Sequence, residues 1–392
     1  MPPLEGRRIW FVGIGGAGLS GYAVLARAWG AEVGGWDRVE TPYLSALEGV
    51  PLELAPEPVV PDGWPEVVVS TAYRDQVPGK PRAELLAELV SLQRSIVVAG
   101  AHGKTTTAAM TAYTLDRLGD DPAFLIGGEV PQLGGNARAG SGWLVVEGDE
   151  SDRTLAALRP EIAVLTNVDL DHHTEFASRA EVEALFERWL ESAPIAIRGD
   201  ELGELETELL VVGRHNRRNA AVAVAAVEAA GYSRSAAENV VGEFGGVRRR
   251  LETRGERRGV IVIDSYAHHP AELGADIAAA ANGGRVLVLF QPHLFSRTRH
   301  LAREFGSTLA SADVIAVADV YRARERPVEG VTGKLVVDAV ADARPGAEIA
   351  WTPALEDGVR FLASRARAGD CVLTLGAGDV DRAAPLLLEA LA

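Results

Sequence analysis

The amino-acid sequence predicts an α/β protein made of three domains. Short apolar runs, typical of buried strands, alternate with helical stretches along the whole chain, as they do in proteins with parallel sheets. Glycine-rich turns follow two of these runs, and the 392 residues allow about two to four domains at roughly 100–200 residues each. We expect boundaries near residues 90 and 242, which gives domains at residues 1–90, 91–242 and 243–392.

The composition excludes several classes of protein. Hydrophobic residues make up 47% and charged residues 24%, a globular composition, and no apolar run approaches the roughly 18 residues of a membrane helix. The N-terminus carries no apolar segment ending in a cleavage site, so we predict a cytoplasmic protein with no membrane partner. A net charge of −16 argues against nucleic acid as a partner. The single cysteine, Cys371, is expected to be a buried core thiol. The oligomeric state stays open.

The first domain begins with a strand, a glycine turn and a helix. The apolar run Arg8–Val12 leads into Gly13-Ile-Gly15-Gly16-Ala-Gly18, which fits G-x-G-x-x-G. Glycines let the backbone approach a diphosphate, and the N-terminus of the following helix supplies N–H donors. A Rossmann-like domain that binds a nucleotide diphosphate is therefore predicted. Asp37 ends the next strand, where such folds place an acid on the ribose, although a simple turn residue is an equal alternative.

The second domain repeats this order from residue 95. The strand-like run Ser95–Ala99 leads into Gly100-Ala-His102-Gly103-Lys104-Thr105-Thr106-Thr107 and a helix. In a turn of this kind the backbone N–H groups cradle phosphates, the lysine bridges the β- and γ-phosphates, and the following threonine reaches Mg²⁺. Lysine occurs only at Lys80, Lys104 and Lys334, which makes its place in this turn specific. We therefore predict a P-loop ATPase domain with ATP and Mg²⁺ as cofactors.

Acidic residues and histidines follow two further strand-like runs. The segments are Glu147-Gly-Asp149-Glu150-Ser-Asp152 and Asn167-Val-Asp169-Leu-Asp171-His172-His173. Strand ends line the ligand crevice of a parallel sheet, and Mg²⁺ prefers oxygen ligands beside nucleotide phosphates. Glu147 is therefore a candidate metal ligand and His172 a candidate ligand to a second ion. Some of the other acids are expected only to cap the next helix.

The third domain is predicted to be Rossmann-like as well. Apolar strand-like runs with intervening helices extend from residue 259 to residue 375, after a strong helical pattern over residues 216–231 of the second domain that ends in glycine. Histidines lie in or beside the motifs named here and below, at His102, His172, His173, His215, His268, His269, His293 and His300. Histidines scattered over a surface would not gather in this way.

Taken in order, these segments resemble the Mur ligase family, and within it the MurC type, over nearly the whole chain. GIGGAGLS resembles the family's nucleotide-sugar turn and GAHGKTTT resembles its ATP loop. VEGDESD and TNVDLDH resemble the segments that carry a metal-binding glutamate and a metal-binding histidine, here Glu147 and His172. Each segment is modest by itself, but eight of them stand in family order.

The remaining four segments lie in the second half of the chain. Residues 213–219, GRHNRRN, resemble a helix start that contacts the adenine side of ATP. Residues 244–251, FGGVRRRL, resemble an arginine motif, and residues 264–270, DSYAHHP, resemble a turn that meets ATP and substrate. Residues 291–299, QPHLFSRTR, resemble a motif near the substrate carboxylate and the incoming amino acid.

The resemblance implies a role for each matching residue. It implies catalytic roles for Lys104, Glu147, His172, Arg249 and His268. It implies ATP contacts from Gly100, His102, Gly103, Lys104, Thr105, Thr106, His215, Asn216, Asn219, Arg249 and Asp264. It implies substrate contacts from Gly15, Gly16, Gly18, Ser20, His269, His293 and Arg297, and metal ligands at Thr105, Glu147 and His172. Asp37 and Ser70, which end strand-like runs of the first domain, are further candidate substrate contacts.

The function implied is ATP-dependent ligation of L-alanine to UDP-N-acetylmuramate in peptidoglycan synthesis. Making an amide from a carboxylate requires activation, and phosphoryl transfer from ATP gives an acyl phosphate that an amine attacks. A P-loop lysine, Mg²⁺ and arginines would neutralise the charge that develops, and Arg249, Arg250 and Arg297 suit this because guanidinium matches carboxylate and phosphate.

Three departures from the family pattern leave alternatives open. Leu294 stands where the family usually has arginine, residues 191–212 replace a longer stretch of the central domain, and Thr174 stands where an aspartate is frequent. The alternatives are a related ligase for a different amino acid or peptide, and a non-catalytic paralogue that binds nucleotide sugar. An NAD-dependent oxidoreductase is supported only by the first glycine turn and Asp37.

Overall fold

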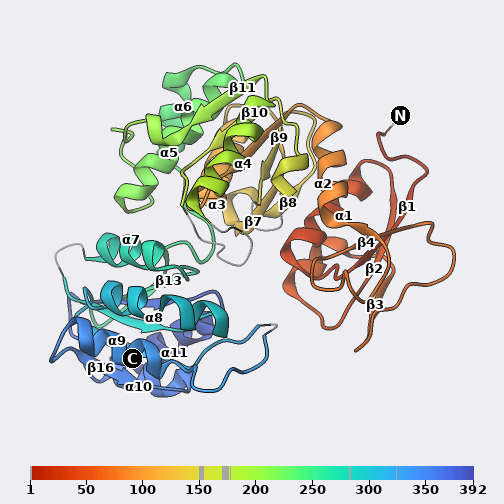
Figure 1. Ribbon diagram of the computed structural model, residues 1–392. Helices are drawn as coiled ribbons and strands as arrows, with labels where there is room; N and C mark the ends of the chain where they lie inside the picture. The colour runs from red at the N-terminus through yellow and green to blue at the C-terminus, as the bar shows by residue number, and fades with distance from the viewer. Residues whose placement is uncertain (1, 150–153, 170–175, 177, 282–283, 324) are drawn as a thin grey trace. The chain divides into compact units, whose positions relative to one another are not determined.

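The chain forms two compact units that contain three sheets (Figure 1). The computed structural model describes residues 2–149, 154–169, 176, 178–281, 284–323 and 325–392. The first unit comprises Met1–Leu210 and Asn216–Val247, and the second comprises Val211–His215 and Arg248–Ala392. The first unit holds two of the sheets and the second unit holds the third. The predicted α/β class with mainly parallel strands is confirmed, whereas the boundaries near residues 90 and 242 remain predictions.

The first sheet has the strand order β3-β2-β1-β4-β5, and its neighbouring strands pair in parallel. Its central strand β1 is an apolar run buried on both faces, and α1 connects it to β2. The strands are β1 (Arg8–Val12), β2 (Glu32–Asp37), β3 (Leu52–Leu54), β4 (Glu66–Val69) and β5 (Lys80–Pro81), with helices α1 (Ala17–Ala28), η1 (Pro42–Leu47) and α2 (Arg82–Ser91). The glycine turn therefore lies at the carboxyl end of the central strand, as predicted.

The second sheet has the order β11-β10-β6-β9-β7-β8, with only the β7–β8 pair antiparallel among its described strands. Its strands are β6 (Ser95–Ala99), β7 (Ala123–Val130), β8 (Gly135–Arg138), β9 (Leu144–Glu147), β10 (Ile162–Leu165) and β11 (Ile195–Arg198). The helices are α3 (Lys104–Arg117), α4 (Arg179–Glu191), α5 (Arg214–Ala229) and α6 (Arg234–Val241), with short turns η2 (Pro131–Leu133), η3 (Thr154–Ala157) and η4 (Gly199–Glu201). The carboxyl ends of β6, β9 and β10 therefore meet at one edge.

The two sheets of the first unit share one apolar core. The same cluster of buried side chains contains Phe11 of β1 and Val97 of β6. Helix α1 packs against β7 and β8 (Figure 1), and this close approach favours a glycine, because a Cβ atom at Gly21 would lie 3.0 Å from Leu125 and 3.1 Å from Ala137. The first glycine turn is thereby held against the second sheet.

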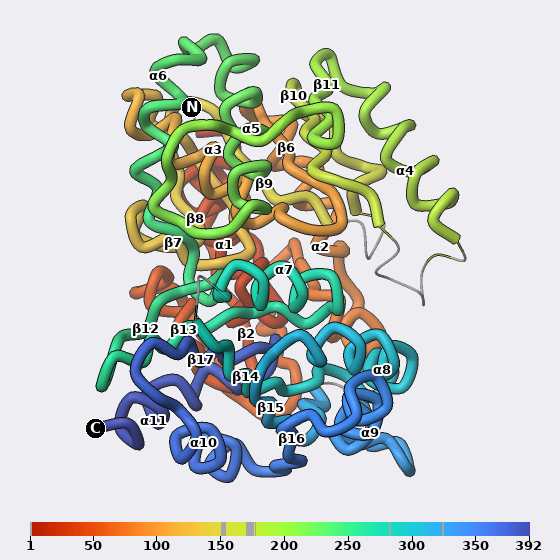
Figure 2. Tube along the Cα trace, turned by 90° about the vertical axis from the view of Figure 1, so that its left-hand side faces the viewer, coloured from red at the N-terminus to blue at the C-terminus, as the bar shows by residue number. Residues whose placement is uncertain are grey.

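The second unit is built on the sheet order β12-β13-β17-β14-β15-β16, in which β12 is antiparallel to β13. Its strands are β12 (Glu252–Arg257), β13 (Val260–Ser265), β14 (Val286–Phe290), β15 (Val314–Val317), β16 (Glu348–Trp351) and β17 (Cys371–Leu375). The helices are α7 (Pro270–Ala280), α8 (Phe295–Leu309), α9 (Lys334–Ala343), α10 (Leu355–Ala363), η5 (Val380–Arg382) and α11 (Ala383–Ala390). Figure 2 shows the helices and strands of this unit. One apolar cluster joins the sheet to α7, α8 and α9, and another joins it to α10 and α11.

Two properties predicted from composition can be examined in the fold. Cys371 is buried in β17, as expected, and burial raises the pKa of its thiol to about 11. Among the described residues, no helix has both the length and the apolar character needed to cross a membrane.

Asp276 of α7 gives the second unit a pH-dependent stability. Its side chain is buried and accepts a hydrogen bond from Ser265 Oγ at 2.5 Å, and burial raises its pKa to about 7. The folded state keeps this proton up to about pH 7, whereas the unfolded chain releases it near pH 4, so stability falls as the pH rises through that window. We expect Asp276→Asn to raise the unfolding midpoint by a few degrees at pH 8 and to change it little at pH 4.

Thermal unfolding of the wild type and the variant at both pH values measures this effect. Asp342→Asn, at an exposed position on α9, is the matched control and should shift neither midpoint. An Asp276→Asn protein that is less stable than the wild type at pH 8 would contradict the burial of a neutral carboxyl group.

Candidate functional site

The second glycine turn joins β6 to α3 and depends on two glycines. Gly100 has φ +131° and Gly103 has φ +81°, values that favour glycine. A Cβ atom at Gly100 would lie 2.2 Å from Thr166 Oγ1, and one at Gly103 would lie 2.4 Å from Asn219 Oδ1. The turn is therefore enclosed by polar side chains from the end of β10 and from α5.

The end of β10 holds the backbone of this turn. His102 N donates to Asn167 Oδ1 at 2.9 Å, and its carbonyl accepts from Asn167 Nδ2 at 2.8 Å and from Thr166 Oγ1 at 2.7 Å. The ring of His102 lies 3.5 Å from the carboxylate of Asp169. Sequence reasoning assigned no role to Thr166 or Asn167, although they begin the quoted TNVDLDH segment.

The predicted phosphate and metal groups come together at the start of α3. Lys104 Nζ donates to the carbonyls of Gly100 at 2.6 Å and Ala101 at 3.2 Å, so the ammonium lies over the turn. Thr105 Oγ1 donates to Glu147 Oε1 at 2.9 Å, and Gly127 N donates to Glu147 Oε2 at 2.8 Å. The hydroxyl and the carboxylate expected to hold a metal thus lie side by side.

The remaining predicted groups of the ATP and metal site differ in where they lie. Thr106 is buried in the first turn of α3. Asn219, against Gly103, donates from Nδ2 to Asn216 Oδ1 at 3.1 Å, so both asparagines belong to this site. His215 is grouped with the second unit, and burial lowers the pKa of its ring. His172 lies outside the described residues, and among those described no group of three or more His, Cys, Asp or Glu forms a metal cluster.

The first glycine turn is held by its own neighbours. Asp37 Oδ2 accepts from Gly15 N at 2.7 Å, and Asp37 Oδ1 accepts from Arg38 N at 2.7 Å. Thr41 Oγ1 donates to the Gly15 carbonyl at 2.7 Å. These bonds agree with the alternative that Asp37 is a turn residue. A contact between Asp37 and a ribose remains a prediction. Thr41 was missed because it lies outside the glycine motif.

The other residues predicted at this turn lie around its backbone. Gly16 is the N-cap of α1, and Gly18 lies in the first turn of that helix. Ser20 is buried and donates to the Ala17 carbonyl at 3.2 Å. A Cβ atom at Gly13 would lie 2.7 Å from Ser70 Oγ, so Ser70 stands directly against the turn.

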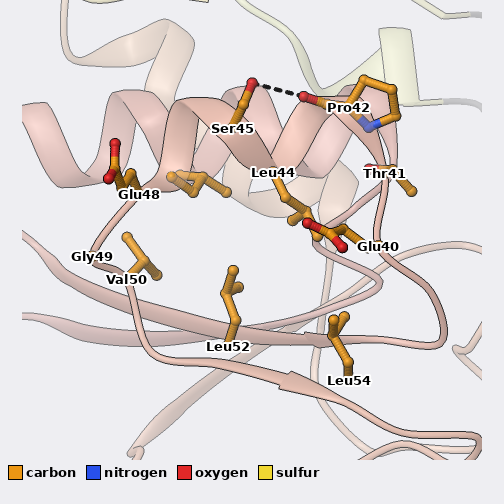
Figure 3. Close-up of a pocket in the computed structure, with 11 residues that line it drawn as sticks. Glu40, Thr41, Pro42, Leu44, Ser45, Glu48, Gly49, Val50, Leu52 and Leu54 are labelled. Carbon is orange, nitrogen blue, oxygen red and sulfur yellow. Dashed lines mark hydrogen bonds between the residues drawn. The ribbon is translucent and has the colours of Figure 1, made fainter.

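An open pocket of about 680 Å³ begins beside this turn (Figure 3). It lies between η1 and β3, and its wall combines aliphatic side chains with two carboxylates and two hydroxyls, from Glu40, Thr41, Pro42, Leu44, Ser45, Leu47, Glu48, Gly49, Val50, Leu52 and Leu54. Thr41 links the pocket to the turn through its bond to Gly15. The sequence carried no motif for this pocket.

Arg249 organises the strand ends of the second unit. Its Nε donates to Asp264 Oδ2 at 3.0 Å, while its terminal nitrogens donate to the carbonyls of Gly378 at 3.1 Å and Gly376 at 2.8 Å. Asp264 is fully buried and also accepts from Thr374 Oγ1 at 2.6 Å. Burial raises the pKa of Asp264, and the positive charge of Arg249 opposes that shift. The glycines at 376 and 378 were not singled out by sequence reasoning.

Two of the predicted histidines of the second unit, His268 and His293, lie in a row of aromatic rings. The rings of Tyr266 and His268 are 5.5 Å apart, those of His268 and His293 are 6.1 Å apart, and His293 stacks on Tyr321 at 5.8 Å. The ring of His269 caps α7 by accepting from Ala271 N at 3.4 Å, which agrees with the packed-turn alternative. Tyr321 was missed because no quoted motif contains it.

The QPHLFSRTR segment follows the end of β14 and runs into the start of α8. Leu294 is the N-cap of α8 with φ +70°, a conformation unusual for leucine, and its N–H donates to the Tyr321 carbonyl at 2.9 Å. Arg297 is half-buried in the first turn of α8. The departure at Leu294 thus occurs at a strained position beside the row of rings.

Comparison with known proteins identifies the family. Residues 98–198 match the Mur ligase middle domain, and residues 249–378 match the Mur ligase glutamate ligase domain. A UDP-N-acetylmuramate–L-alanine ligase of Rubrobacter xylanophilus is 39% identical over 447 residues, covering 98% of this chain and 100% of that protein. The chain belongs to the Mur ligase family. The ligase of the same name from Streptomyces avermitilis is 38% identical and covers 97% of both chains.

The structure of the MurC ligase of Thermotoga maritima resembles this Mur ligase throughout. Its TM-score is 0.79 at 25% identity, and the match covers 97% of this chain and 98% of that one. The alignment with the R. xylanophilus protein spans 447 positions against 392 residues here, so at least 55 positions (447 − 392) have no counterpart in this chain. This agrees with the expectation that the chain is shortened. That the missing stretch belongs at residues 191–212 remains a prediction.

Proposed function

We propose that this Mur ligase joins L-alanine to UDP-N-acetylmuramate with ATP, through an acyl phosphate, in peptidoglycan synthesis. The observation that carries the proposal is a full-length likeness, 39% identical over 98% of the chain, to a ligase named for this reaction. The P-loop turn supports it, because an oxidoreductase that used only the first glycine turn would have no need of Lys104 over a second turn or of Thr105 beside Glu147. The NAD-dependent alternative is therefore not favoured.

The first unit supplies the groups that the phosphoryl transfer needs. The turn at residues 100–103 and the N-terminus of α3 offer backbone N–H groups and a helix dipole to the phosphates of ATP. Lys104 already lies over that turn and would move onto the β- and γ-phosphates when they bind. Asn216 and Asn219 stand at the same turn and would contact the nucleotide beyond its phosphates.

Mg²⁺ fits the oxygen atoms found beside this turn. Thr105 Oγ1 and Glu147 Oε1 are 2.9 Å apart, close enough for both to reach one ion. Mg²⁺ prefers oxygen ligands and usually keeps waters and phosphate oxygens, so two protein ligands suffice. When bound, the ion would neutralise charge on the transferred phosphoryl group.

The use of ATP also favours the cytoplasm as the location of the enzyme.

The second unit would act on the amino acid and on the acyl phosphate. His268 and His293 present imidazole rings beside Tyr266 and Tyr321, where they could bind the amine and the carboxylate of the amino acid. Arg249 would act chiefly by fixing Asp264 and the strand ends, because its nitrogens all bind within the unit. Leu294 stands where an arginine is usual in the family, so a ligase that joins a different amino acid is the second candidate function.

A screen of the twenty amino acids with UDP-N-acetylmuramate, ATP and Mg²⁺, read by phosphate release, tests the proposal. We expect release to require all components and to be greatest with L-alanine. Greater release with another amino acid would select the alternative ligase. Binding of the nucleotide sugar without release with any amino acid would select the non-catalytic paralogue, and the ligase proposal would fail.

A further inference from the structure

Arg82 lies between the first glycine turn and the acidic strand end of the second sheet. A Cβ atom added at Gly18 would lie 3.4 Å from Arg82 Nη1, and Arg82 Nη2 donates to Asp149 Oδ2 at 3.2 Å. Arg82 is the first residue of α2, and its side chain is 26% exposed. One guanidinium group therefore spans from the predicted nucleotide-sugar turn to a residue two positions beyond Glu147.

The two ends of this bridge are held in place by packing inside the first unit. Asn136 Nδ2 of β8 donates to the Ala17 carbonyl at 2.9 Å, which ties the start of α1 to the second sheet. Gly21 brings α1 against Leu125 and Ala137, and both sheets share one apolar core. The distance between Gly18 and Asp149 is therefore set by the fold, and Arg82 occupies a defined place within it.

The charges around Arg82 suit an anion bound at the turn. Helix α1 carries no acidic residue in its first turn, and its N-cap Gly16 has no side chain to occupy the helix N–H groups. The bond to Asp149 orients the guanidinium so that Nη1 faces Gly18. A guanidinium group binds phosphate through two parallel N–H donors, which a lysine ammonium cannot do.

We propose that Arg82 binds the diphosphate of UDP-N-acetylmuramate and that Asp149 positions its guanidinium group. The proposal rests on the proposed function and adds a substrate-binding residue to it. It also gives a reason for the bridge: the arginine that holds the nucleotide sugar is anchored on the strand end that carries Glu147, so the substrate and the ATP loop are set in register.

Calorimetric titration of each ligand separately, without turnover, tests the proposal. We expect Arg82→Gln to raise the Kd for UDP-N-acetylmuramate about tenfold to a hundredfold, because a charged hydrogen-bonding partner is lost, and to leave the Kd for Mg·ATP within about twofold. UDP alone should show the same loss, since it keeps the diphosphate. Arg82→Lys should give an intermediate loss and serves as the test if Arg82→Gln does not fold. Asp149→Asn should weaken binding less than Arg82→Gln.

The matched control is Arg234→Gln on α6, where the arginine forms ion pairs with Glu228 and Glu238 and should leave both Kd values unchanged. Wild-type binding of UDP-N-acetylmuramate with an unchanged Kd in folded Arg82→Gln would overturn this inference and leave the proposed function standing. A loss for UDP-N-acetylmuramate without a loss for UDP would overturn the assignment to the diphosphate. A wild-type protein that binds neither UDP-N-acetylmuramate nor Mg·ATP would overturn the proposed function and this inference together.

Discussion

Replacing Lys104 by alanine is expected to lower ATP-dependent phosphate release by at least about a thousandfold while the protein stays folded. The ammonium of Lys104 donates hydrogen bonds to the carbonyls of Gly100 and Ala101 in its own turn, and the buried apolar core of the sheet does not depend on it. Its expected work is to neutralise charge on the β- and γ-phosphates during transfer, where the interaction is strongest. Steady-state phosphate release with UDP-N-acetylmuramate and L-alanine measures the effect.

Lys334→Ala provides the matched control for this experiment. Lys334 begins α9, is exposed and pairs with Asp338, so its removal should leave turnover near the wild-type rate. Far-ultraviolet circular dichroism and the unfolding midpoint should agree among all three proteins. Normal turnover by folded Lys104→Ala would show that the active site is not at this turn.

Replacing Arg249 by alanine is expected to damage both stability and turnover. Asp264 is fully buried, and Arg249 supplies its opposite charge at 3.0 Å, so truncation leaves a buried carboxylate without that partner. The free energy of unfolding should fall by about 3–5 kcal/mol, the usual range for breaking a buried ion pair. Turnover should fall at least about a hundredfold, because the carbonyls of Gly376 and Gly378 also lose their donor and the strand ends lose their arrangement.

A double variant separates the two effects. In Arg249→Ala/Asp264→Asn the buried group is neutral, and Thr374 Oγ1 can still donate to it, so stability should return in large part. Turnover should remain low if Arg249 organises or contacts the reacting groups. Recovery of turnover together with stability would mean that Arg249 serves only to neutralise Asp264, and its assignment to the catalytic residues would be wrong. Chemical denaturation and phosphate release measure the two quantities.

The sequence by itself was sufficient for the main strands and for both glycine turns. β1 and β6 are continuous apolar runs bounded by turn residues, and a strand buried on both faces needs nothing more to be recognised. The turns were predictable because Gly13, Gly100 and Gly103 adopt φ values that other residues avoid. β11 is partly exposed and β7 contains two glycines, so neither carries a strong strand pattern. The same succession of strand and turn also predicted that the candidate catalytic and binding residues would gather at strand ends.

Only the tertiary structure decided which side chains hold which turn. Asn167 hydrogen-bonds to His102, which lies 65 residues away in the sequence. The hydrogen bonds from Arg82 to Asp149 and from Arg249 to Gly376 span 67 and 127 residues. Contacts at such separations depend on strand order and helix packing, which a single sequence does not encode as a local pattern. Local propensity acts over a few residues and therefore predicted where the turns lie, whereas the partners that hold them are set by long-range packing.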